Sequence, residues 1–112
     1  MKVYRGRRLE PDRQTASLVE VLVEENGLAQ PLRHRVYHSP TGFSWGFWGS
    51  GPADLARSIL WDCLDEYRAK SLYQQFKVQF VGKWGQEWEI SEEEIQEWAV
   101  RMAVAIGISV QS

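Results

Sequence analysis

Cysteine is almost absent from this chain of 112 residues, which contains only Cys63. No disulfide can therefore form within the chain, and such cysteine usage is typical of a reducing compartment. The N-terminal stretch MKVYRGRRLE has no apolar segment after its charges, and no apolar run reaches membrane-spanning length. The sequence therefore predicts a cytoplasmic protein without a secretory signal.

A surplus of positive charge is also lacking. The chain has 13 basic and 15 acidic residues, a net charge of −2, whereas proteins that bind the nucleic-acid backbone normally carry a basic excess or a basic stripe. The most basic segment holds Arg5, Arg7 and Arg8. We interpret it as a solvated edge strand whose charges block aggregation, rather than as a phosphate contact. Nucleic acid is therefore not the expected partner.

The signatures of common catalytic and cofactor sites are missing as well. The chain has no G-x-x-x-x-G-K-[S/T] motif and no G-x-G-x-x-G motif, because Gly49 and Gly51 supply the first two glycines of the latter and Asp54 occupies the third position. The two histidines and the cysteine do not have metal-ligand spacing. The acidic run Glu92–Glu94 suits the first turn of a helix. We therefore expect no metal and no cofactor.

What the chain does contain is the composition of one folded domain, residues 1–112. Hydrophobic residues make up 44% and charged residues 25%, both close to the average of globular proteins. Strand signals occupy the first half and helix signals the second. This order predicts an α+β fold, in which a small antiparallel sheet of three or four strands is covered on one face by about three helices.

The predicted strands cover residues 2–8, 15–25 and 86–90. In the first, Gly6 indicates a bulge or a bend. The second alternates valines with glutamates, as a half-buried strand does. The third, QEWEI, is either a short strand or an extended link.

The dipeptide Asn-Gly at 26–27 is the signal of a two-residue hairpin turn. Counting back from that turn pairs Val21 with Leu32 and Glu20 with Arg33. The first pair is apolar and the second is an ion pair on the opposite face, so this register is chemically consistent.

The first predicted helix opens at Gly51-Pro52, with Pro52 at its first position and Asp54 in its first turn, where a carboxylate complements the helix dipole. Its apolar stripe continues to Tyr67, and a break at 68–71 precedes a second helix.

The third helix has the strongest start signal, a capping box formed by Ser91 and Glu94, and Gly107 is predicted to end it. Its expected buried positions are Ile95, Trp98, Ala99, Met102 and Ile106.

One stretch, YHSPTGFSWGFWGSGPADLA at 37–56, combines glycine, proline and aromatic residues in a way that ordinary loops do not. Phe43, Trp45 and Phe47 alternate with other side chains, which is compatible with a short strand. We expect Trp45 to pack in the core and Trp48 to be partly exposed. Aromatic residues in a glycine-rich setting can stack on bases, sugars or a partner's side chains.

The start of the first helix offers a second candidate site. Backbone N–H groups at Gly49–Asp54 are available to an anion, the glycines allow close approach, and the Ser50 hydroxyl can add a donor. The alternative is a purely structural helix opening, for which Gly-Pro is common.

His38 is the candidate acid–base residue, because it borders this loop and histidine titrates near neutral pH. Ser39, Ser50 and Asp54 can in principle join it, although no spacing defines a triad. The alternative is a histidine that hydrogen-bonds to the backbone of its own loop.

The segments YRGRR, HSPTGFSWGFWGSGPADLA, LYQQFK and WEISEEEI together resemble a family of small bacterial, archaeal and phage-borne proteins catalogued as a domain of unknown function. The resemblance covers residues 2–95, and its specific part is the block His38–Ala56, which is similar to the pattern H-S-P-T-G-F-x-W-G-x-x-G-S-G-P-A-x-L-A. It implies a small standalone domain found in genomes and mobile elements, and it implies no particular activity.

The leading prediction is a non-enzymatic interaction or accessory module that presents loop 38–51 to a protein partner. A small-anion or nucleotide binder using Gly49–Asp54, and an enzyme using His38, are the alternatives. The candidate contact residues are His38, Ser39, Trp45, Trp48, Ser50, Gly51 and Asp54.

Overall fold

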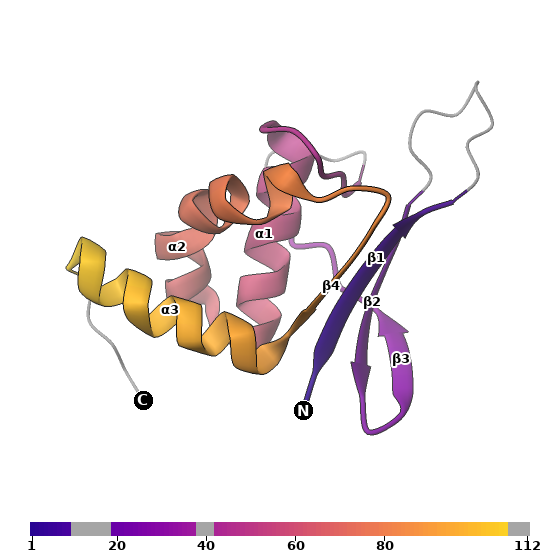
Figure 1. Ribbon diagram of the computed structural model, residues 1–112, viewed down its shortest axis with the longest axis horizontal. Helices are drawn as coiled ribbons and strands as arrows, with labels where there is room; N and C mark the ends of the chain where they lie inside the picture. The colour runs from indigo at the N-terminus through magenta and orange to yellow at the C-terminus, as the bar shows by residue number, and fades with distance from the viewer. Residues whose placement is uncertain (10–18, 38–41, 108–112) are drawn as a thin grey trace.

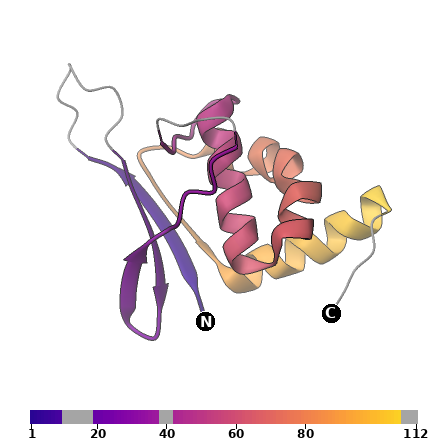
Figure 2. The same ribbon diagram turned by 180° about the vertical axis from the view of Figure 1, so that it is seen from behind.

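A computed structural model describes residues 1–9, 19–37 and 42–107 of the chain. These residues form one four-stranded antiparallel sheet and three α-helices, so the predicted α+β class is confirmed. Figure 1 shows the three helices gathered on one side of the sheet, and Figure 2 shows the same arrangement from behind. The elements in chain order are β1 (Val3–Arg8), β2 (Val19–Glu25), β3 (Leu28–Pro31), α1 (Ser50–Cys63), α2 (Glu66–Gln79), the 3-10 helix η1 (Val81–Lys83), β4 (Glu87–Ser91) and α3 (Glu92–Ile106).

The strand order is β3-β2-β1-β4, so β1 lies inside the sheet. The prediction that this arginine-rich strand is an edge was wrong. Alternate residues of β1 point to opposite faces, and Tyr4 and Gly6 are buried while Arg5 and Arg7 are exposed. The two arginines pair with glutamates of both neighbouring strands, which allows a charged strand to be central.

Gly6 forms no bulge, because β1 keeps a continuous register with both neighbours, with Gly6 opposite Val21 and Trp88. A methyl group at Gly6 would overlap the Trp88 indole. The glycine is therefore needed for close approach of a side chain, and the predicted bend was wrong.

The predicted hairpin is confirmed. Asn26 and Gly27 have φ angles of 55° and 80°, as such a turn requires. The Leu32 N–H donates to the carbonyl of Val21 over 3.0 Å, which continues the predicted register beyond the end of β3. Glu20, however, pairs with Arg7 of β1, at 2.8 Å, instead of Arg33.

Helix α1 ends earlier than predicted, and the break lies at residues 64–65 instead of 68–71. The Asp65 side chain accepts a hydrogen bond from the Arg68 N–H over 2.7 Å and so caps α2. Tyr67 consequently belongs to α2, where it is exposed, and not to the apolar stripe of α1. Pro52 is the third residue of α1. An N–H group at this position has no intrahelical acceptor, so its absence from proline costs the helix no hydrogen bond.

Helix α3 has the predicted capping box of Ser91 and Glu94, and Gly107 ends it in the left-handed conformation, with φ 77°. Ile106 was wrongly assigned to the core, because it is exposed, and Ala103 is buried instead.

The core lies between the sheet and the helices. Its largest members include Tyr4 of β1, Trp88 of β4, Phe76 of α2 and Trp98 of α3. Phe76 and Trp98 have ring centroids 5.2 Å apart, and Phe76 and Phe80 5.0 Å apart. In the described segments, no helix has both the length and the apolar composition needed to cross a membrane.

Candidate functional site

The glycine-rich aromatic stretch forms an irregular segment that enters α1. Residues 42–45 have no regular structure and residues 46–49 form bends, so the short strand suggested by the alternation of Phe43, Trp45 and Phe47 was wrong. Gly46 explains this difference, because its φ of 85° interrupts an extended conformation. We call residues Gly46–Gly49 the aromatic turn.

Trp45 fixes the base of the aromatic turn in the core, as predicted, and is only 1% exposed. Its indole N–H donates to the carbonyl of Gly85 over 2.6 Å, and its ring meets that of Trp88 edge to face at 5.6 Å. The Arg8 guanidinium donates to the Trp45 carbonyl over 2.8 Å and lies over the indole. Since the Gly46 N–H also donates to the Val81 carbonyl, over 3.0 Å, the turn is held from several sides.

Phe47 and Trp48 follow in the turn and are 53% and 64% exposed. The prediction that Trp48 is partly exposed is therefore confirmed. Its indole lies against the backbone of Gly82, where a methyl group would overlap it, and the Phe47 ring similarly lies close to Gly49. Two adjacent aromatic side chains thus rest on glycines with much of their surface in solvent.

The first turn of α1 is mostly covered. Gly51 is buried, and a side chain there would overlap Ser44, whereas Ser50 is exposed. Asp54 lies beyond the first turn and is fully buried, so its predicted place at the positive end of the helix was wrong.

The carboxylate of Asp54 instead holds the segment that contains His34 and Tyr37. Its Oδ2 atom is 2.9 Å from His34 Nε2 and accepts the Tyr37 N–H over 3.0 Å. Sequence reasoning considered His34 only as a metal ligand. No local signal connects it to Asp54, because the two residues are 20 positions apart.

His38 and Ser39 lie outside the described residues. The acid–base role of His38 and the participation of Ser39 therefore stay predictions. Within the ranges that are described, no group of three or more His, Cys, Asp and Glu side chains is arranged to hold a metal ion.

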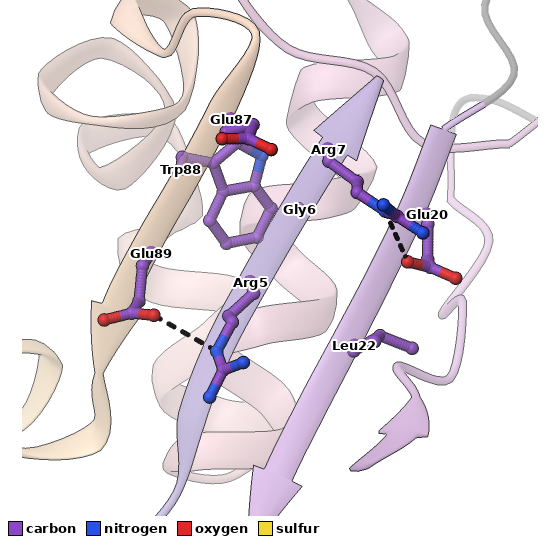
Figure 3. A pocket seen from close by; sticks show the side chains of 8 residues that line it. All are labelled: Arg5, Gly6, Arg7, Glu20, Leu22, Glu87, Trp88 and Glu89. Carbon is purple, nitrogen blue, oxygen red and sulfur yellow. Dashed lines mark hydrogen bonds and ion pairs between the residues drawn. The ribbon is translucent and has the colours of Figure 1, made fainter. Parts of the chain in front are cut away.

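The face of the sheet opposite the helices carries a shallow groove of about 630 Å³, shown in Figure 3. Arg5 pairs there with Glu24 and, over 3.1 Å, with Glu89, while Arg7 pairs with Glu20. Arg5 and Arg7 are thus neutralised by glutamates of neighbouring strands, which reduces the positive charge available to a phosphate backbone.

Cys63 at the end of α1 is partly buried. Burial is the main cause that raises the pKa of its thiol from 9.0 to about 12. The thiol is therefore protonated at neutral pH, and a protonated thiol is a poor nucleophile.

These features define a small α+β domain with a buried tryptophan anchor and an exposed aromatic turn. The chain belongs to a family of unknown function, DUF6166, whose model matches residues 4–101. Searches of curated proteins and of solved structures gave no match.

Proposed function

We propose that the protein is a non-enzymatic interaction module that presents the aromatic turn to a protein partner. The observation that carries this proposal is the exposure of Phe47 and Trp48, at 53% and 64%, on a turn whose base is fixed by Trp45. Large aromatic side chains are the usual energetic anchors of protein interfaces.

The rigidity of the turn supports the same role. At its base, the carbonyl of Trp45 accepts a hydrogen bond from Arg8, and the Gly46 N–H donates one to the carbonyl of Val81. A partner would therefore meet two aromatic rings already in place, and ordering them would cost little conformational entropy.

The anion-binding alternative at Gly49–Asp54 has weaker support. Gly51 is covered by Ser44, and the buried carboxylate of Asp54 adds negative charge close to the same helix start. Ser50 alone keeps an exposed side chain there.

The test is affinity capture from cells of the source organism with three matched baits: wild type, Trp48→Ala and Tyr67→Ala. Tyr67 is the control because it is an aromatic residue on α2 with 57% exposure, similar to that of Trp48. We expect a protein that wild type and Tyr67→Ala recover in equal amounts and that Trp48→Ala recovers at least about tenfold less, as the loss of a central aromatic anchor implies. Equal recovery by Trp48→Ala would contradict the proposal, provided that its circular dichroism spectrum matches wild type.

A further inference from the structure

Arg57 of α1 is a buried cation that has no carboxylate partner among the described residues. Its side chain is 9% exposed. Within residues 1–9, 19–37 and 42–107, neither an ion pair nor a hydrogen bond engages its guanidinium. Buried charged groups are normally paired, because an unpaired ion is costly to remove from water.

Aromatic rings surround this guanidinium instead. Its central carbon lies 4.2 Å from the ring centre of Tyr37, 5.6 Å from that of Trp61 and 6.0 Å from that of Tyr73. Arg35 approaches the Trp61 ring as well, at 4.5 Å. We call these five residues the arginine–aromatic cluster.

Stacking on rings stabilises a guanidinium through its flat face and leaves the five N–H donors at its edge unused. Gln75 Oε1 and Trp88 Nε1 are the buried side-chain atoms without a partner in the described part of the chain, and no nitrogen of Arg57 is among them. Because no hydrogen bond among the described residues engages the Arg57 nitrogens, their absence from this pair of atoms means that they are not completely enclosed. A ligand can therefore approach them.

The cluster is held in place by α1. The Arg35 N–H donates to Ser58 Oγ over 2.9 Å, and the Tyr37 N–H donates to Asp54 Oδ2 over 3.0 Å. Both acceptors are almost completely buried. Figure 2 shows the segment that follows β3 running towards α1. Two arginines from different segments are thus positioned before any ligand arrives, which lowers the entropic cost of binding.

We propose that the arginine–aromatic cluster binds the phosphate group of a small phosphorylated molecule, with Arg57 as the main ligand and Arg35 as the second positive charge. The planar guanidinium fork matches two oxygens of a phosphate. A phosphate monoester carries about −1.5 to −2 charges at neutral pH, which balances two arginines, whereas a carboxylate balances one. This site is separate from the aromatic turn and does not depend on the function proposed for that turn.

Inorganic phosphate is the probe for the test, measured against chloride at equal ionic strength by thermal unfolding and by the width of the phosphorus NMR line. We expect phosphate to raise the Tm of the wild-type protein by about 3 °C and to broaden its NMR line. Arg57→Met should lose both effects. Arg101→Met should keep both, because Arg101 is an exposed arginine on α3.

Three results would overturn the proposal: no phosphate effect on wild type, an equal effect on Arg57→Met, or an equal effect of acetate, which would assign the site to carboxylates. If Arg57→Met does not fold, Arg57→Lys and Arg35→Met replace it, and each should weaken the phosphate effect several-fold. Trp48→Ala should retain the full phosphate effect, which separates the failure of this proposal from the failure of the interaction role.

Discussion

Gly6 of β1 and Trp88 of β4 lie directly opposite each other in the sheet, and the Trp88 indole fills the place where a side chain at Gly6 would be. This contact places Trp88 against two other tryptophans, of which Trp45 holds the base of the aromatic turn. Trp88 stacks on Trp84, with ring centroids 4.0 Å apart, and meets Trp45 edge to face.

We therefore predict that Gly6→Ala destabilises the protein by about 2–3 kcal/mol, because the added methyl group displaces a packed indole. Equilibrium unfolding in urea measures the change. Gly85→Ala is the matched control, since a methyl group there meets open space, and it should change stability by less than about 0.5 kcal/mol. Equal effects of the two substitutions would show that the contact between Gly6 and Trp88 is not tight.

Asp54→Ala should destabilise the protein by about 3 kcal/mol, because it leaves the Tyr37 N–H and the His34 ring without their buried acceptor. The expected local result is faster hydrogen exchange at the Tyr37 amide, measured by NMR. Asp54→Asn keeps one acceptor oxygen and should therefore destabilise the protein less than Asp54→Ala does. The assigned role of Asp54 is wrong if the Tyr37 amide exchanges at the same rate in wild type and Asp54→Ala.

The raised pKa of Cys63 predicts a loss of stability at alkaline pH. The folded state holds the thiol proton more tightly than the unfolded chain does, with a pKa of about 12 against 9.0. The contribution of the protonated thiol to the free energy of unfolding is therefore complete below pH 9.0 and is lost as the pH rises towards 12. Unfolding in urea at several pH values, with Cys63→Ala as the reference, measures this difference. A difference between the two proteins that does not change over this pH range would contradict the prediction.

Several features follow from short-range signals in the sequence. The Asn26-Gly27 turn, the capping box of α3 and the end of that helix at Gly107 were all predicted correctly. Each depends on hydrogen bonds or backbone angles within a few residues, so the local sequence is sufficient to specify it.

Features that involve distant residues were predicted poorly. The interior position of β1 depends on β4, which follows about 80 residues later, and on glutamates in both neighbouring strands. The break between α1 and α2 was misplaced because the residues near position 68 are ordinary helix formers, whereas Asp65 provides the actual cap.

The sequence by itself determined the α+β class, the hairpin and the special character of the stretch around Trp45. Only the tertiary structure decided that Trp48 rests exposed on Gly82, that Asp54 holds His34, and that Arg57 lies among aromatic rings. Side-chain surroundings of this kind arise where segments far apart in the chain meet. They depend on packing and burial, which no local sequence pattern encodes.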